Sequence, residues 1–167
     1  MSIEGMTVFN SKRVKVTEQP MFFGQPLGVQ RYDSYKYPIF DKLTTQQLGY
    51  FWRPEEVSLQ KDRSDYHMLR PEQKHIFTSN LLRQTALDSL QGRGPTQIFL
   101  PVVSVPELEA LCLLWGFFET NLHSKSYSHI IRNIYNVPKE EFNKIHDTKE
   151  IVDMAANIGR HYEELHQ

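Results

Sequence analysis

The sequence predicts an all-α protein. Apolar residues recur at spacings of three and four along several segments, and proline and glycine stand where such helices should begin and end. No segment shows the alternation of apolar and polar residues that is typical of a half-buried strand. With 167 residues, of which 40% are hydrophobic, the chain is long enough for one domain with a core of its own.

The first 37 residues are predicted to form an irregular arm. Proline and glycine interrupt them too often for a regular element, at Pro20, Gly24, Pro26 and Gly28. Met21, Phe22 and Phe23 lie among these residues, and we expect them to anchor the arm on the body of the protein. Residues 38–167 are predicted to form the helical domain.

Two helices are expected in the first half of this domain. The first begins at Pro38 and ends near Arg53, because Pro54 disfavours a helical conformation in the preceding residue. The second begins at Pro71 and runs to about Arg93, where glycines stop it. Its apolar residues are Ile76, Phe77, Leu81, Ala86, Leu87 and Leu90.

The third helix is expected to be the longest and the most apolar, and to extend to about Ile134. Ser104 and Glu107 have the spacing of a capping box at its start. A short helix can follow from Pro138 to Ile145. A last helix should contain Ile151, Met154, Ala155, Ile158 and Tyr162.

Three polar residues interrupt the third helix after its apolar first half. Glu119, His123 and Tyr127 follow one another at intervals of four, so Glu119 and His123 differ by ~40° around the helix axis and lie one turn apart. A buried carboxylate needs a partner, and a metal ion can satisfy both a carboxylate oxygen and an imidazole nitrogen. A satisfied Glu–His pair, or a polar end of the helix, explains the same pattern without a metal.

A third candidate ligand, Asp88, lies on the second helix. It belongs to a polar stripe that is also typical of a solvated helix face, formed by Asn80, Gln84, Asp88 and Gln91. Asp88 lies ~7 Å before the end of its helix and Glu119 ~22 Å after the start of the next. The two can meet if the connecting residues 94–104 span this difference, as an extended segment of eleven residues can.

Composition excludes several classes of function. The formal net charge of -1 gives no electrostatic basis for binding nucleic acid or an anionic membrane. No segment has the length and hydropathy of a transmembrane helix or of a secretory signal. The single cysteine, Cys112, lies between two leucines, so a buried and unreactive thiol in a reducing compartment is expected. These features predict a soluble cytoplasmic protein.

Four blocks of sequence resemble the small (R2, or beta) subunit of class I ribonucleotide reductase, in particular its bacterial and bacteriophage forms. The blocks are "EQPMFFGQPLGVQRYD", "YFWRPEEVSLQKDR", "QTALDSLQGR" and "ETNLHSKSYSHIIRNIY". They occur in the order of the family, and the similarity runs from about Glu18 to the last residue. The resemblance implies the N-terminal half of a ferritin-like di-iron helical bundle.

The resemblance also implies roles for individual residues. Asp88, Glu119 and His123 are similar in position to family ligands of a dinuclear iron site, in which manganese can replace iron. Tyr127 is similar to the tyrosine that becomes a stable radical. Trp52 is similar to a tryptophan on the route of electron and radical transfer between the metal site and the surface.

Two departures from the family pattern are present. His123 lies four positions after Glu119 instead of the usual three, so we expect a single-turn π-bulge to absorb one extra residue. In addition, the chain carries only half of the metal core, since the family's second half supplies a further Glu and a Glu-x-x-His motif. Glu72 with His75 and Glu163 with His166 have that motif's spacing, but they lie in a polar first turn and at a frayed helix end.

The resemblance therefore implies an N-terminal portion of an enzyme subunit that makes a tyrosyl radical for the reduction of ribonucleotides to deoxyribonucleotides. Its implied partners are the large catalytic subunit, a separate C-terminal half and a second copy in a homodimer. In a bacteriophage its place would be the host cytoplasm. The alternative is an iron-free helical fragment that acts as an assembly module with a C-terminal half.

Overall fold

The computed structural model describes residues 7–165, and their regular structure is helical. Within these residues there is no named β-strand, and a single isolated bridge joins Phe22 to Val103. The predicted all-α class is confirmed. None of the helices in the described part of the chain is long and apolar enough to cross a membrane.

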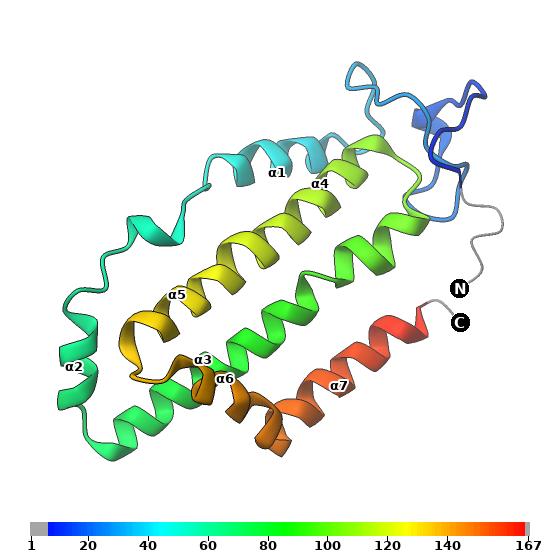
Figure 1. The fold of residues 1–167 in the computed structure, drawn as a ribbon. Helices are drawn as coiled ribbons and strands as arrows, with labels where there is room; N and C mark the ends of the chain where they lie inside the picture. Colours follow the sequence, from blue (N-terminus) through cyan, green and yellow to red (C-terminus); the bar gives the residue numbers. More distant parts are fainter. Residues whose placement is uncertain (1–6, 166–167) are drawn as a thin grey trace. The chain divides into compact units, whose positions relative to one another are not determined.

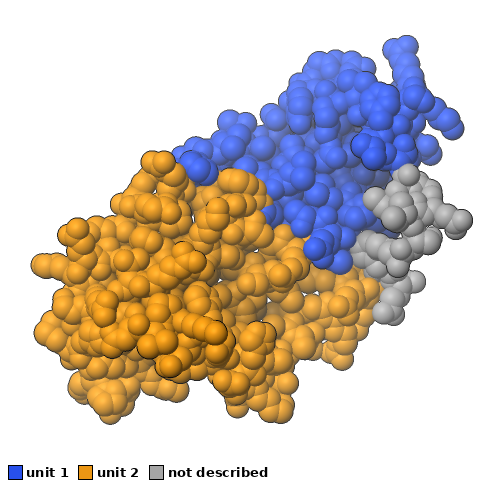
Figure 2. Space-filling model, in the orientation of Figure 1, with its two compact units in different colours: residues 1–51, 94–116 blue, residues 52–93, 117–167 orange. Residues whose placement is uncertain are grey.

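The chain divides into two compact units (Figure 2). Unit 1 consists of residues 1–51 and 94–116, and unit 2 of residues 52–93 and 117–167. Each unit combines two separate stretches of the chain. The predicted division is instead a single boundary after residue 37, between an arm and a helical domain. The predicted boundary stays a prediction.

Unit 1 contains helix α1 (Pro38–Leu48) and nearly all of helix α4 (Pro106–Phe117). Shorter helical segments are η1 (Val16–Glu18), the π-helix η3 (Gly94–Phe99) and the 3-10 helix η4 (Leu100–Val102). Its core is formed by Val103, Val105, Leu108 and Cys112, against which Phe22, Phe40 and other side chains pack. Phe22 thus anchors the arm as expected, whereas Phe23 is 77% exposed.

A buried carboxylate ties the arm to the start of α4. Glu107 is fully buried, and its Oε1 accepts hydrogen bonds from the backbone N–H groups of Lys36 at 3.1 Å and Tyr37 at 2.9 Å. Glu107 lies in the first turn of α4, where the unpaired backbone N–H groups carry a partial positive charge. This position also favours a negatively charged side chain. The predicted capping box is therefore not formed: Glu107 binds the arm, and the N–H of Ser104 donates to the carbonyl of Met21 at 2.9 Å.

Cys112 behaves as its sequence context predicts. It is 3% exposed, and burial raises the pKa of its thiol to about 11. The thiolate is the reactive form of cysteine, so this side chain is unreactive near neutral pH.

Unit 2 is built around helix α3 (Pro71–Gln91), which contacts α5 (Ser124–Ile134), α6 (Pro138–Asp147) and α7 (Lys149–Glu164) (Figure 1). Apolar side chains from α3, α5 and α7 meet in one core. Its buried members are Leu81, Leu82, Ile131, Ile134, Tyr135 and Ile151. The unit also contains η2 (Pro54–Glu56), α2 (Asp62–Met68) and the π-helix η5 (Phe118–His123).

The predicted helices are present, with local differences. The first ends at Leu48, five residues before the predicted end, and α2 has no counterpart among the predicted helices. The third helix is divided into α4, η5 and α5. Residues 94–102 are helical, so the connection after α3 is not the extended segment that the sequence permitted.

The core of unit 2 should depend strongly on Ile131, which is fully buried. We expect Ile131→Ala to lower the free energy of unfolding by about 2–5 kcal/mol, because it removes buried methyl groups and leaves a cavity. Chemical denaturation followed by circular dichroism measures this change. The matched control is Ile76→Ala on α3, since Ile76 is 61% exposed; an equal loss in both variants would contradict the assigned core.

Candidate metal centre

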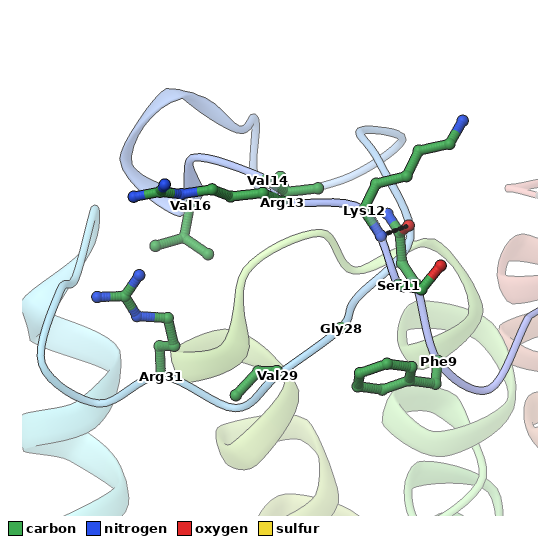
Figure 3. Close-up of a pocket in the computed structure, with 10 residues that line it drawn as sticks. Phe9, Ser11, Lys12, Arg13, Val14, Val16, Gly28, Val29 and Arg31 are labelled. Atoms are coloured by element: carbon green, nitrogen blue, oxygen red, sulfur yellow. Dashed lines mark hydrogen bonds between the residues drawn. The ribbon is translucent and has the colours of Figure 1, made fainter.

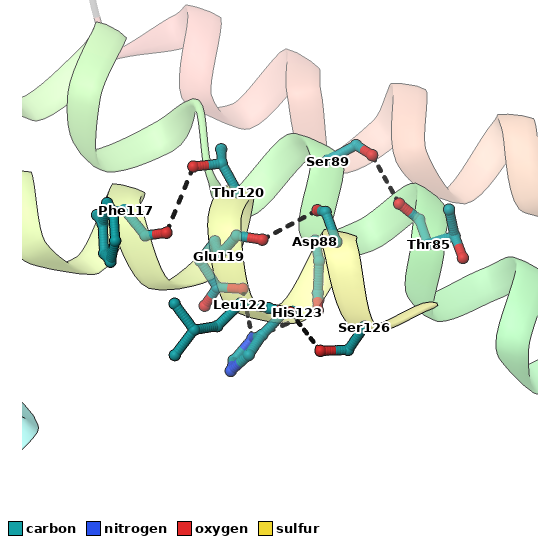
Figure 4. A network of polar contacts seen from close by, with 10 residues as sticks. Thr85, Asp88, Ser89, Phe117, Glu119, Thr120, Leu122, His123 and Ser126 are labelled. Carbon is teal, nitrogen blue, oxygen red and sulfur yellow. Dashed lines mark hydrogen bonds and ion pairs between the residues drawn. The ribbon is translucent and has the colours of Figure 1, made fainter. Parts of the chain in front are cut away.

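Three side chains with metal-ligating atoms converge in unit 2. Asp88 comes from the last turns of α3, and Glu119 and His123 come from η5 (Figure 4). One potential ligand atom from each residue lies within 4.8 Å of the others. The expectation that Asp88 and Glu119 meet is confirmed.

The π-helical turn makes this convergence possible. Residues 118–123 form η5, in which the N–H of Ser124 donates to the carbonyl of Glu119 five residues earlier. The hydroxyl of Ser124 donates to the same carbonyl at 2.9 Å. A π-turn accommodates one more residue than an α-turn, so the extra residue is absorbed and His123 stays on the side of Glu119. The predicted bulge is confirmed.

The imidazole of His123 faces both carboxylates through one atom. Its Nδ1 lies 2.9 Å from Oε2 of Glu119 and 3.4 Å from Oδ2 of Asp88. The carboxylate side chains are 15% and 13% exposed, respectively, whereas the imidazole is 41% exposed. The cluster is therefore shielded on the side of the carboxylates and accessible at the imidazole.

This donor set fits a divalent transition-metal ion. Carboxylate oxygens with one imidazole suit iron, manganese or zinc, and three ligands leave coordination positions open. Oδ2 of Asp88 is buried and makes no hydrogen bond; Nδ1 of His123 approaches it to 3.4 Å, so this oxygen is available to a cation at the same point. The Glu–His pair of the alternative reading is also formed, since a proton on Nδ1 can bridge His123 to Glu119. A metal ion would replace that proton.

Tyr127 lies beside the same carboxylates. It is half-buried on α5, one turn after His123, and the carboxylates of Asp88 and Glu119 both act on the pKa of its phenol. Burial is the main reason why the pKa of Tyr127 is raised well above that of an exposed tyrosine, and the nearby carboxylates of Asp88 and Glu119 add to the shift. The phenol therefore stays protonated at neutral pH.

Two further contacts around the cluster were not predicted. The hydroxyl of Tyr162 donates to Oε1 of Gln91 at 2.6 Å and fixes α7 against α3 one turn beyond Asp88. Gly92 allows η5 to approach α3, because a Cβ at this position would lie 2.6 Å from Cγ2 of Thr120. The sequence pattern predicts this glycine only as a helix stop, and it leaves open whether the stripe that contains Gln91 is a solvated face.

The remaining candidates lie outside this cluster. Glu72, His75 and Glu163 are exposed, and His166 lies outside the described residues. Trp52 is half-buried, two residues before η2, which packs against α5. Its predicted role in electron transfer is not tested by this position.

An open hollow of about 300 Å³ lies in unit 1, far along the chain from these residues (Figure 3). It is lined by the arm and carries exposed basic side chains, including Lys12, Arg13 and Arg31. Arg31 is already paired with Asp33. None of the predicted site residues lines it.

Comparison with known proteins points to one family. A family model described as "Ribonucleotide reductase, small chain" matches residues 30–167. The chain belongs to this family. Among its relatives, the ribonucleoside-diphosphate reductase subunit beta of Buchnera aphidicola is 52% identical over 159 residues, which are 95% of this chain and 42% of that protein. The chain thus spans less than half the length of this relative.

Solved structures of the ribonucleotide reductase family share the fold. The R2 subunit from Clostridium botulinum has a TM-score of 0.87 at 23% identity, and the match covers 96% of this chain and 50% of that one. The dimanganese(II)-NrdF of Streptococcus sanguinis has a TM-score of 0.74 at 21% identity, over 82% of this chain and 49% of that one. The predicted fold, an N-terminal half of a ferritin-like helical bundle, is confirmed.

The close approach at Gly92 predicts a specific sensitivity. Gly92→Ala should lower the free energy of unfolding by about 1–3 kcal/mol, because the new methyl group collides with Thr120 and pushes η5 away from α3. The matched control is Gly49→Ala at the end of α1, where the nearest atom to a Cβ is a carbonyl oxygen of the same helix at 3.2 Å. Thermal unfolding compares the two variants, and equal effects would show that η5 does not pack on Gly92.

The raised pKa of Tyr127 predicts a dependence of stability on pH. Above a pH of about 10, where an exposed tyrosine ionises, the unfolded chain loses this proton and the folded chain keeps it. The free energy of unfolding should therefore fall as pH rises, and it should fall less steeply in Tyr127→Phe. Denaturation at a series of alkaline pH values measures both slopes. Tyr50→Phe is the control, because Tyr50 is 60% exposed; if it changed the slope as much, the burial of Tyr127 would not be the cause.

Proposed function

We propose that this chain is the N-terminal part of a ribonucleotide reductase small subunit and carries half of a dinuclear metal site together with the tyrosine that the site oxidises. The convergence of Asp88, Glu119 and His123 on one point, with the phenol of Tyr127 beside it, is the observation that carries this proposal. Membership of the family supports it.

Asp88, Glu119 and His123 would hold the metal through two carboxylate oxygens and Nδ1. Iron is the proposed metal, and manganese fits the same ligands, as the name of the Streptococcus sanguinis protein indicates for that relative. When bound, a pair of reduced metal ions supplies electrons for the reduction of dioxygen and so generates an oxidant for a nearby phenol.

Tyr127 would lose one electron and one proton in that oxidation. The carboxylate of Asp88, which lies close enough to raise the pKa of the phenol, would provide a nearby base for the proton. Apolar neighbours of the same core exclude water from the ring, which favours a neutral phenoxyl radical over a charged species. Trp52 would carry electrons between this region and the surface.

The remaining ligands would come from a C-terminal half, because the relatives are more than twice as long as the matched region. The 41% exposure of the His123 side chain leaves room for such a contribution. The assembled subunit would form a homodimer, act with the large catalytic subunit in the cytoplasm and support the reduction of ribonucleotides to deoxyribonucleotides.

A metal-free assembly module is the second candidate. The observation in its favour is the 2.9 Å contact between His123 and Glu119, which satisfies both side chains without a metal. In that case the cluster would stabilise the fold and hold the contact with a separate C-terminal half.

Metal binding separates the two candidates. Titration of the chain with Fe²⁺ or Mn²⁺ under anaerobic conditions should reveal about one weakly bound ion, because three protein ligands form only part of a site. Glu119→Gln and His123→Ala should each weaken binding by about tenfold or more. Calorimetry measures the affinity, with Glu72→Gln and His75→Ala as exposed controls that retain it. Binding that is unchanged in Glu119→Gln would refute the proposed ligands.

The proposed incompleteness predicts a conditional radical. The chain alone, loaded with Fe²⁺ and exposed to oxygen, should give no lasting tyrosyl signal by electron paramagnetic resonance. Addition of a chain that supplies the C-terminal half should restore the signal, and Tyr127→Phe should then abolish it. A stable radical from the 167 residues alone would mean that the chain completes the site by itself, for example between two copies.

A further inference from the structure

The last turn of α3 presents Asp88 and is contacted by two other elements of unit 2. Asp88 lies three residues before the end of the helix at Gln91, and its carbonyl accepts a hydrogen bond from the N–H of Gly92 at 2.9 Å. The first element is η5, because a Cβ at Gly92 would lie 3.4 Å from Cβ of Glu119. The second is α7, which packs on α3.

Two contacts attach α7 to this turn. The hydroxyl of Tyr162 donates to Oε1 of Gln91 at 2.6 Å. Three residues earlier on α7, Gly159 lies so close to α3 that a Cβ at this position would be 3.3 Å from Cδ1 of Leu90. Residues three apart lie on the same face of a helix, so one face of α7 makes both contacts. The hydrogen bond therefore forms where the two helices are already close.

The end of a helix needs contacts of this kind to stay ordered. The last carbonyl groups of a helix have no partner within it, and terminal turns open at little cost in free energy unless other groups hold them. Asp88 belongs to the last turn of α3, so an opening of this turn would move its carboxylate away from Glu119 and His123. The hydrogen bond between Tyr162 and Gln91 opposes that opening.

The phenol of Tyr162 remains a hydrogen-bond donor near neutral pH. Its pKa is raised above that of an exposed tyrosine, mainly by burial and further by the charge of Glu119. The phenol therefore keeps its proton, and the amide oxygen of Gln91 can accept it in a hydrogen bond. The effect of Glu119 also indicates that the phenol lies near the ligand cluster.

We propose that Tyr162 and Gln91 are positioning residues for the metal ligands. Their hydrogen bond holds α7 on the last turn of α3 and so keeps the carboxylate of Asp88 beside Glu119 and His123. Neither residue itself contacts the metal ion in this proposal. The inference rests on the proposed function, since it requires that the cluster binds a metal ion.

Metal binding by Tyr162→Phe tests this role, because the substitution removes only the hydroxyl. Loss of a partly buried hydrogen bond that supports a ligand should weaken the binding of Mn²⁺ by about threefold to tenfold, as measured by calorimetry. The matched control is Tyr135→Phe. The hydroxyl of Tyr135 also has a partner, the hydroxyl of Thr78 at 2.7 Å, but it follows the end of α5 that is distant from His123. This control should retain the affinity.

The visible absorption of bound Co²⁺ gives a second readout. It depends on the number and arrangement of the ligands, so it should change in Tyr162→Phe and stay the same in Tyr135→Phe. A purely structural hydrogen bond would lower the thermal stability of both variants and leave the affinity and the spectrum of both unchanged. That result would overturn the proposal.

Gln91→Met tests the same hydrogen bond from its other partner. Methionine has a similar length but no amide oxygen, so it should weaken Mn²⁺ binding about as much as Tyr162→Phe does. In the double variant the loss should be no greater than in either single variant, because both remove one interaction. Additive losses would show that the two side chains act separately, which contradicts the proposal.

Hydrogen exchange examines the last turn of α3 without a metal. The amide of Gly92 and its neighbours in this turn should exchange about threefold to tenfold faster in Tyr162→Phe than in the unmodified chain or in Tyr135→Phe. Unchanged exchange would refute the proposed hold on the turn. Failure of the proposed function is recognised separately, because the unmodified chain would then bind no Mn²⁺. In that case the positioning role would be refuted as well, even if exchange showed that Tyr162 stabilises the turn.

Discussion

The burial of two carboxylates beside one imidazole is the constraint on which the site depends. Asp88 and Glu119 are shielded from water, and negative charges that approach each other in a poorly solvated space require a cation or a shared proton. Nδ1 of His123 lies within reach of both. The π-turn that directs this atom inward, and the glycine that permits the close contact with α3, both serve this arrangement.

The same carboxylates determine the properties of the neighbouring phenol. The pKa of Tyr127 is raised by burial and by the carboxylates of Asp88 and Glu119, and its side chain packs against the core of unit 2. A carboxylate at the hydroxyl and apolar groups around the ring favour a neutral phenol and, after the loss of an electron and a proton, a neutral radical. In the proposed function, metal ligation by Asp88 and protection of a radical at Tyr127 are therefore connected through one aspartate.

Most helices and the π-bulge could be predicted from local patterns in the sequence. Proline at the start of α1, α3 and α6 and the spacing of apolar residues predicted those helices, because local sterics and amphipathicity act over a few residues. The extra residue between Glu119 and His123 predicted a bulge, since a helix has few ways to absorb it. Glu107 shows where such local patterns fail. Its spacing from Ser104 predicted a capping box, but its buried carboxylate accepts hydrogen bonds from the backbone N–H groups of Lys36 and Tyr37 in the arm instead.

The sequence by itself determined the helical class, the family and the candidate ligands, because these follow from spacing along one chain and from matching blocks of residues. Tertiary structure alone decided which polar side chains meet. Gln91 and Asp88 share one stripe on α3, yet one binds Tyr162 and the other joins the ligand cluster. Thr78 has no distinguishing pattern, and only the packing of α2, α3 and α5 brings two phenols to its hydroxyl. Such contacts depend on distances between helices, which no periodicity within a single helix can specify.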